Sequence, residues 1–248
     1  MPAKLYVIPA SHPSTSAELM LQRKGLAYER RDLIHAMHIP IVKAMGFPGR
    51  TVPALEWEDG RKVQGTREIS RFLDQVKPEP PLFPADAERR RTVEEAERWG
   101  DEELQPVPRR LAWYAFGRDR STVKDFLRGY NLGLPTSVAA ATAAPIIWAE
   151  QKVHWATGAA CRADLERLPE LLGHVDELIA QGVIGSDVPN AADYQIATSV
   201  RLLMAFDQLG SLLDGRPAAA LAERIAPAPG GRVPAALPNE WITQRHSG

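Results

Sequence analysis

The chain begins with a short apolar run that is followed directly by a helical pattern. Residues 4–8 (KLYVI) predict a buried strand that ends at Pro9. From Ala17 onward, apolar positions recur at helical spacing, and Gly25 is the expected C-terminal cap of that helix. Residues 27–33 (AYERRDL) predict a second strand, so this part of the pattern indicates a β-α-β unit.

A second unit of two strands and a helix is predicted after an irregular segment. The strings VPALEW and RKVQ predict two short strands around the turn signal Asp59-Gly60. The apolar stripe of the following helix consists of Ile69, Phe72, Leu73 and Val76. The order β-α-β, irregular segment, β-β-α therefore indicates an α/β domain at residues 1–77.

Proline marks the end of this domain, and the pattern beyond it is helical. The string KPEPPLFPAD contains four prolines, so we interpret residues 78–86 as a linker. Helical periodicity then dominates residues 87–248, which predicts an all-helical C-terminal domain. Within it, Asn190 is expected to cap a helix together with Asp193. The Pro/Gly-rich tail IAPAPGGRVPAALPNEW is expected to lie extended over the surface.

Composition and charge argue against several classes of function. The net charge is -1, from 30 Lys+Arg and 31 Asp+Glu, which gives no electrostatic reason to expect nucleic acid or a membrane as partner. The N-terminus lacks the pattern of a secretory signal, and the longest apolar stretch is interrupted by Pro145. A single cysteine, Cys161, permits no intrachain disulfide. We therefore expect a soluble cytoplasmic protein.

Four strings, in this order and spacing, resemble the cytosolic glutathione transferase family over nearly the whole chain: KLYVIPASHPSTSAELMLQRKGLAYE, RTVPAL, DGRKVQGTREISRFLD and NAADYQIA. The resemblance implies a thioredoxin-like N-terminal domain (βαβ-ββα) that binds glutathione as a cosubstrate, followed by an all-α domain. It also implies that a small-molecule electrophile binds in a cleft against the C-terminal helices, and that the protein forms a homodimer.

Given this resemblance, the turn after the first strand carries the candidate chemistry. A thiol with a pKa of about 8.5 is mostly protonated at neutral pH, and only the thiolate is a useful nucleophile. A hydroxyl at a helix N-terminus stabilises the anion, because it donates to sulfur where the helix dipole favours negative charge. Ser11 falls where theta- and zeta-like members carry their active serine, and Ser14 is the second candidate. In the alternative reading, both hydroxyls satisfy only backbone groups.

The segment before the third strand resembles the part of the family that binds the glutathione backbone. The bond between Val52 and Pro53 is cis in the family, which implies that the Val52 backbone pairs with the cysteinyl part of glutathione. Arg50, just before this motif, is the candidate cation for the glycyl carboxylate.

At the next segment the chain departs from the family pattern. The family has an acidic residue and a serine where this chain has Gly65 and Thr66. Thr66 suits the γ-glutamyl carboxylate, because it would lie at a helix N-terminus. Gln64 substitutes for the missing acidic side chain, or Gly65 only eases close backbone approach. The missing carboxylate favours a rival interpretation, a non-catalytic binding or scaffold module.

The second substrate is expected to be largely apolar. The candidate cleft residues are Trp113 and Tyr114, although large aromatic side chains are more often core. The uncommon insert at residues 131–158 motivates a third interpretation, a specialised enzyme for ether cleavage or isomerisation. Another low-molecular-weight thiol remains an alternative to glutathione.

We predict no metal site. His35 and His38 (HAMH) are the closest approach to a ligand pattern, but no carboxylate or cysteine cluster completes it. We therefore interpret these two residues as an exposed pair on a helix or loop.

Overall fold

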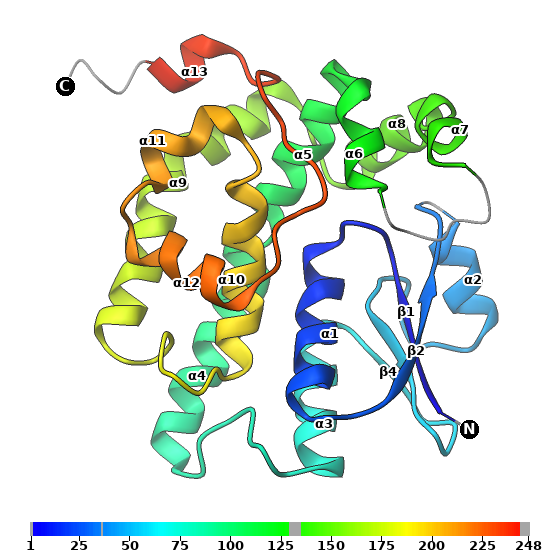
Figure 1. Cartoon of the computed structure of the whole chain (residues 1–248), viewed down its shortest axis with the longest axis vertical. Helices are drawn as coiled ribbons and strands as arrows, with labels where there is room; N and C mark the ends of the chain where they lie inside the picture. The colour runs from blue at the N-terminus through cyan, green and yellow to red at the C-terminus, as the bar shows by residue number, and fades with distance from the viewer. Residues whose placement is uncertain (1, 36, 129–134, 244–248) are drawn as a thin grey trace.

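The computed structural model describes residues 2–35, 37–128 and 135–243, and its N-terminal part is built on a four-stranded mixed sheet (Figure 1). The strands are β1 (Ala3–Val7), β2 (Tyr28–Asp32), β3 (Ala54–Glu56) and β4 (Lys62–Gln64), in the order β2-β1-β3-β4. β1 is parallel to β2 and antiparallel to β3, which is antiparallel to β4. This sheet and the helical remainder confirm the predicted fold class.

The two faces of the sheet are covered by different helices, as the alternation along β1 requires. Leu5 and Val7 belong to the main core, to which α1 (His12–Arg23) and α3 (Thr66–Val76) contribute. Tyr6 points to the opposite face and packs in a small cluster with Val42 of α2 (His38–Ala44). α1 and α3 therefore lie between the sheet and the C-terminal helices, while α2 covers the outer face (Figure 1).

Helix α2 occupies the segment that we expected to be irregular, so that prediction was wrong. The helix has only seven residues, of which His38 and Val42 are buried. Two buried positions make too short an apolar stripe to be recognised by periodicity.

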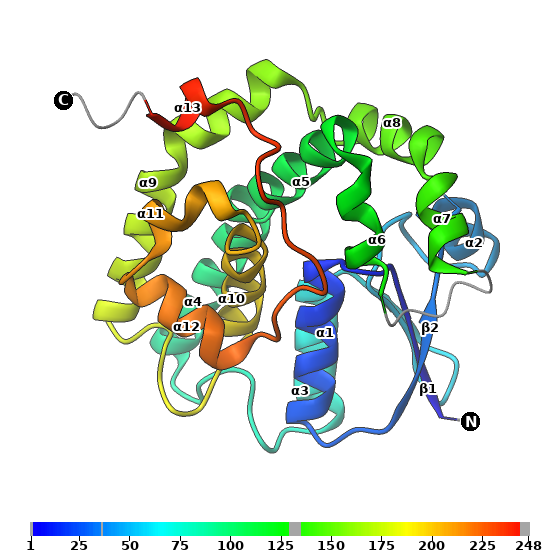
Figure 2. The ribbon, with the colours of Figure 1, turned by 45° about the horizontal axis from the view of Figure 1, so that its top comes forward.

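The C-terminal part is a bundle in which α10 (Ala191–Leu203) occupies the centre (Figures 1 and 2). Every residue of α10 except Arg201 is buried. The capping box predicted for Asn190 and Asp193 is confirmed, since each side chain accepts from the other residue's backbone N–H. The longer helices around α10 are α4 (Ala87–Trp99), α5 (Pro106–Arg118), α9 (Gly158–Ala180) and α12 (Pro217–Ile225). A π-helical turn, η1 (Gly100–Leu104), joins α4 to α5.

Short helices complete the chain: η2 (Arg120–Thr122), α6 (Val123–Phe126), α7 (Thr136–Ala141), α8 (Ala144–Val153), η3 (Asp207–Leu209), α11 (Gly210–Leu213) and α13 (Asn239–Thr243). The insert at 131–158 supplies α7 and α8, while 131–134 lie outside the described residues.

The tail between α12 and α13 lacks helix, but it is not a surface strand. Val233 bridges to Phe206, and Leu237 is buried as well, so the expectation of a superficial tail was wrong.

The two parts share one apolar core, and a buried lysine joins α1 to the linker. Lys24 is fully buried, and its ammonium donates to Asp74 Oδ1 (2.7 Å) and to the carbonyls of Lys77 (2.7 Å) and Pro78 (3.2 Å). Asp74 also accepts from the backbone N–H of Leu82 (2.8 Å). These bonds fix the C-terminal end of α1, and hence the direction of the helix whose other end carries Ser11. Within the described residues, no helix is both long and apolar enough to cross a membrane.

Candidate active site

A strained turn places Ser11 at the start of α1. Its backbone N–H donates to the Ile8 carbonyl (3.2 Å), which closes a four-residue turn with Pro9 and Ala10 in the middle. Ala10 has φ 57, in the left-handed region that glycine adopts more readily. Ser11 is then the N-cap of the helix, with Pro13 in the first turn.

The geometry gives Ser11 and Ser14 different environments. Ser14 is 1% exposed, and its hydroxyl donates to Ser11 Oγ (3.0 Å). Ser11 Oγ also accepts from the Ser14 backbone N–H at 3.4 Å. Ser11 is half-buried and lines a cleft. Because its oxygen already accepts from two donors of Ser14, its own O–H remains available to donate to a ligand in the cleft.

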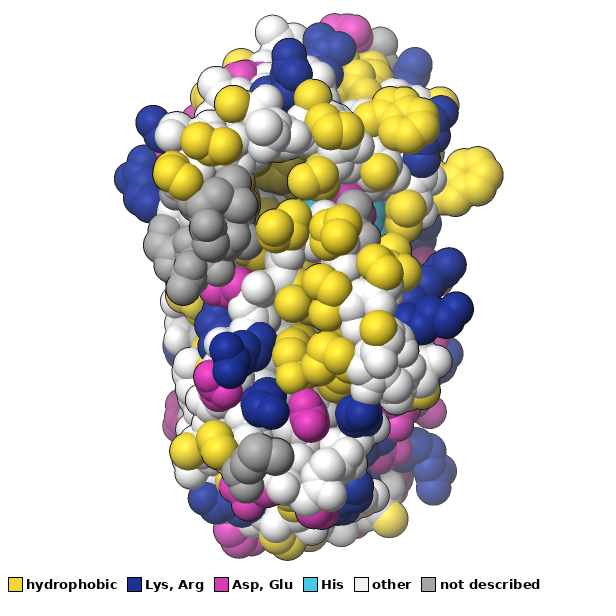
Figure 3. Space-filling model, turned by 90° about the vertical axis from the view of Figure 1, so that its right-hand side faces the viewer, with side chains coloured by type: hydrophobic (Ala, Val, Ile, Leu, Met, Phe, Trp, Pro, Cys, Tyr) yellow, Lys and Arg dark blue, Asp and Glu magenta, His cyan; other side chains and the backbone are white. Residues whose placement is uncertain are grey.

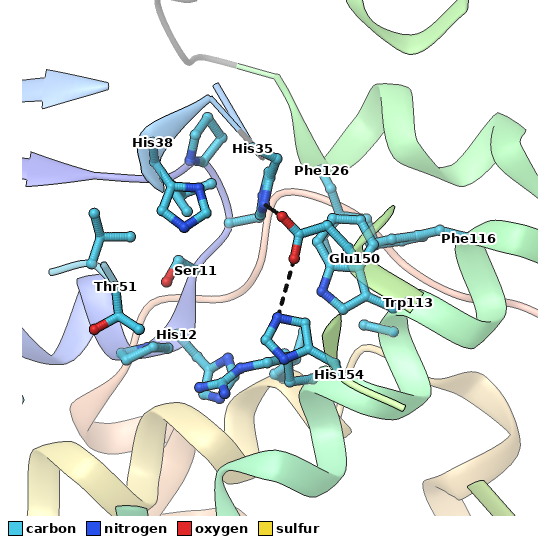
Figure 4. Close-up of a pocket in the computed structure, with 18 residues that line it drawn as sticks. Ser11, His12, His35, His38, Thr51, Trp113, Phe116, Phe126, Glu150 and His154 are labelled. Atoms are coloured by element: carbon cyan, nitrogen blue, oxygen red, sulfur yellow. Dashed lines mark ion pairs between the residues drawn. The ribbon is translucent and has the colours of Figure 1, made fainter. Parts of the chain in front are cut away.

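The cleft lies where the turn before α1 meets α5 and α8 (Figure 4). Ser11, His12 and Thr51 line it from the N-terminal part, and Trp113, Phe116, Glu150 and His154 from the helical part. Arg109 of α5 also lines the cleft and has no ion-pair partner within 4.0 Å among the described residues. The cleft is therefore apolar on the side of the α5 aromatic rings and rich in nitrogen donors on the other.

The Val52-Pro53 peptide bond is cis, as the resemblance implied, and Val52 lines the cleft. In the part of the chain that the structure describes, no hydrogen bond engages the Val52 backbone N–H or carbonyl. The Gly65 N–H donates to the Pro53 carbonyl (2.9 Å), which brings the start of α3 beside this turn. Thr66, the residue after Gly65 and the first of α3, is buried.

Three other candidates for glutathione binding are placed differently. The Gln64 amide accepts from the Gly49 N–H (2.5 Å) and donates to the Thr51 carbonyl (2.5 Å), so it braces a loop. Gly65 has φ 94, which disfavours any side chain there. Arg50 is exposed and does not line the cleft.

A second, apolar chamber adjoins the cleft. It is lined by Pro9, Ile34, His35, Trp113, Val123, Leu127, Ala139, Thr142, Ala143, Ile146 and Ile147. Trp113 thus lines both cavities, whereas Tyr114 lines neither and packs on the ring of Trp241 (5.5 Å between centroids). Hydrophobic side chains also gather on the outer face near α2, α7 and α8, where the surface is hollowed (Figure 3).

Four of the chain's six histidines line the cleft: His12, His35, His38 and His154. The interpretation of His35 and His38 as an exposed pair was wrong, because His38 is 8% exposed and the His35 side chain 22%. Burial and the positive charge of Arg109 hold the pKa of His12 well below its usual value. The contact of the ring with the Gln105 carbonyl (3.3 Å) acts in the opposite direction but is outweighed, so the His12 ring is neutral.

Glu150 of α8 lies between two of these imidazoles (Figure 4). Its Oε2 is 3.1 Å from His154 Nε2, and its Oε1 is 3.6 Å from His35 Nδ1. Burial raises the pKa of Glu150, but the imidazoles of His154 and His35 beside it outweigh this effect and hold the pKa well below the usual range. Glu150 is therefore an ionised carboxylate although it is only 4% exposed.

The sequence analysis did not find Glu150 or His154. The only local signal is their spacing of four residues, which places both on one face of a helix. Tyr6 of β1 also carries a hydroxyl, but it donates to Glu56 (3.0 Å), and burial with this carboxylate raises the pKa of Tyr6 to about 12, which does not suit a thiolate donor. Over the described ranges, no group of three His, Cys, Asp or Glu side chains could hold a metal ion.

Comparison with known proteins relates this fold to one class of proteins. Residues 5–81 match the family model for the N-terminal domain of glutathione S-transferases. Beta-etherase LigF from Sphingobium sp. strain SYK-6 has a similar structure, with 21% sequence identity and a TM-score of 0.64, over 93% of this chain and 97% of that one. A glutathione S-transferase from Sinorhizobium meliloti 1021 gives 17% identity and a TM-score of 0.61, over 99% and 100% of the two chains.

Maleylacetoacetate isomerase from Anaeromyxobacter dehalogenans 2CP-1, with bound glutathione, gives 20% identity and a TM-score of 0.56, over 92% and 93% of the two chains. No curated protein matches this sequence. The molecule thus combines a thioredoxin-like sheet with a helical bundle. More particularly, its N-terminal part matches the model for the N-terminal domain of glutathione S-transferases, and the whole chain has the fold of a solved glutathione S-transferase.

Proposed function

We propose that the protein is a glutathione transferase that uses Ser11 to stabilise the glutathione thiolate. The observation that carries this proposal is the orientation of Ser11. Its oxygen accepts from Ser14, which leaves its own O–H free to donate into the cleft at the N-terminus of α1. A hydrogen bond to a charged group is worth about 1.5–3 kcal/mol, which corresponds to a thiol pKa lowered by roughly one to two units.

The neighbouring backbone supports a tripeptide thiol as the ligand. The free N–H and carbonyl of Val52 present a strand-like edge for the cysteinyl part. Thr66 at the start of α3 suits the γ-glutamyl carboxylate, since backbone N–H groups point outward there. Gln64, tied to its loop, leaves the γ-glutamyl end with fewer side-chain partners than the family pattern has.

The second substrate would be an electrophile with an apolar body, which the chamber beside Trp113 suits. Similar folds include a beta-etherase and an isomerase, so we keep ether cleavage and isomerisation as specific candidates. Gly65, where a carboxylate is missing, favours the rival role of a non-catalytic binding module. We further propose that the enzyme is cytoplasmic and acts as a homodimer.

The test is calorimetric titration with glutathione, with the bound thiolate followed by ultraviolet absorbance. The wild-type protein should bind glutathione and ionise its thiol at neutral pH. Ser11→Ala should retain binding but raise the bound thiol pKa by roughly one to two units. Ser14→Ala should raise it by less, because Ser14 acts only through Ser11. Binding without ionisation would favour the binding module, and absence of binding would favour another thiol or a scaffold.

A further inference from the structure

His35 lies at the junction of the two cavities. Pro9, His35 and Trp113 line both the cleft with Ser11 and the apolar chamber, and His35 is the titratable side chain among them. A thiolate held by Ser11 would meet an electrophile from the apolar chamber at this junction. A proton that moves between the two substrates would therefore pass beside His35.

The His35 ring is held in one orientation from two sides. Trp113 packs against it edge to face, with 4.8 Å between ring centroids. Glu150 Oε1 lies 3.6 Å from Nδ1. An ionised carboxylate can only accept, so the Nδ1 that faces it carries the hydrogen, and in the neutral ring Nε2 keeps its lone pair. This is the carboxylate–imidazole arrangement that orients general bases in other enzymes.

We propose that His35, positioned by Glu150, accepts the thiol proton of bound glutathione. The inference rests on the proposed function. In this step the S–H bond breaks, its electron pair stays on sulfur, and the proton binds the free imidazole nitrogen of His35. Ser11 stabilises the resulting thiolate and Glu150 the resulting imidazolium, so the charge separated by the transfer has a partner at each end.

Other charged and titratable groups face the same space. His154 shares the carboxylate of Glu150 on α8, and His38 of α2 lies near both, with a buried Nδ1 that has no hydrogen-bond partner among the described residues. Arg109 of α5 and the neutral His12 of α1 complete the lining. The positive charge of Arg109 stabilises a thiolate in the cleft and destabilises a second cation there. At His35, the negative charge of Glu150 offsets the second effect.

Retaining the proton has a chemical consequence. When a thiolate displaces an alkoxide or phenoxide, or adds to a conjugated carbonyl, the electron pair ends on an oxygen or carbon that must then be protonated. A halide leaving group needs no proton. A proton held on His35 therefore suits electrophiles whose leaving group or adduct must be protonated, such as ethers and conjugated carbonyls.

The experiment counts protons during glutathione binding. Calorimetric titration in two buffers of different ionisation enthalpy gives the protons released per glutathione, and ultraviolet absorbance gives the thiolate formed. We would work at about pH 7.5, above the ordinary histidine pKa of about 6.5. The wild-type protein should form thiolate with almost no proton released. His35→Gln should release close to one proton for each thiolate formed.

Three controls isolate the effect. S-methylglutathione has no thiol proton and should release none from either protein. His174→Gln removes an exposed histidine that has its own carboxylate neighbour, Glu177, at 3.7 Å on α9, and should behave as wild type. Glu150→Gln keeps His35 but removes the negative charge beside it, and should give an intermediate proton release. Equal release per thiolate from wild type and His35→Gln would overturn the proposal. Absence of binding or of thiolate in the wild type would instead overturn the proposed function, and this inference with it.

Discussion

Removing the carboxylate of Asp193 should destabilise the protein more than removing its partner in the capping box. Asp193 is fully buried, and its two oxygens accept from the N–H groups of Gly185 (2.7 Å) and Asn190 (2.9 Å). Asp193→Ala leaves both N–H groups without an acceptor, at about 1–3 kcal/mol each. We expect a loss of about 3 kcal/mol, hence a fall in Tm of roughly 6–12 °C for a chain of this size.

Asn190→Ala provides the matched comparison. The half-buried, uncharged Asn190 side chain makes an ordinary N-cap to two N–H groups at the first turn of α10, so the loss should be about 1 kcal/mol. Thermal unfolding followed by circular dichroism, with urea titrations for the free energy, would measure both variants and the double variant. The double variant should lose less than the sum, because either change frays the same turn. Equal losses from the two single variants would refute the argument that the bonds of the buried Asp193 carboxylate dominate.

Further predictions concern other parts of the fold. Lys24→Met leaves Asp74 and two carbonyls without their donor and should cost about 3 kcal/mol in urea unfolding; an unchanged midpoint would contradict this. Ala10→Gly should stabilise by up to about 1 kcal/mol, because glycine adopts φ 57 without the cost that alanine bears. Burial raises the pKa of Cys161 to about 12, so a thiol reagent at neutral pH should modify it only after unfolding. The lowered pKa of Glu150 stabilises the fold above the ordinary carboxyl pKa of about 4.3, and this contribution is lost as the pH falls further; Glu150→Gln should flatten that part of an acid-unfolding curve.

Local patterns were sufficient for most of the N-terminal domain. A short apolar run that ends at Pro9 identified β1, and the Asn190 capping box marked the start of α10 within one residue, because both depend on neighbours in the chain. Helix α2 was missed since only two of its residues are buried. The tail was misjudged for a different reason: its prolines correctly excluded helix, but the burial of Val233 depends on contact with Phe206, which no local pattern encodes.

The same division runs through the candidate site. The thiolate half is local: a strand, a turn and a helix N-terminus, all within residues 3–23, bring Ser11 to the cleft. The histidine–carboxylate half depends on tertiary structure, since His35 follows β2 while Glu150 and His154 lie on α8, more than one hundred residues later. An i, i+4 pair of Glu and His on a helix is common on protein surfaces, where it is worth a few tenths of a kcal/mol. It differs here because α8 packs beside α5 and buries the carboxylate against the cleft. Glu150 is ionised although it is only 4% exposed, so neighbouring polar groups must compensate for the cost of burying its charge. Two of these groups are the imidazoles of His35 and His154, which line the cleft. Packing of α8 thus places a carboxylate beside His35, a neighbour that the local sequence around Ser11 does not supply.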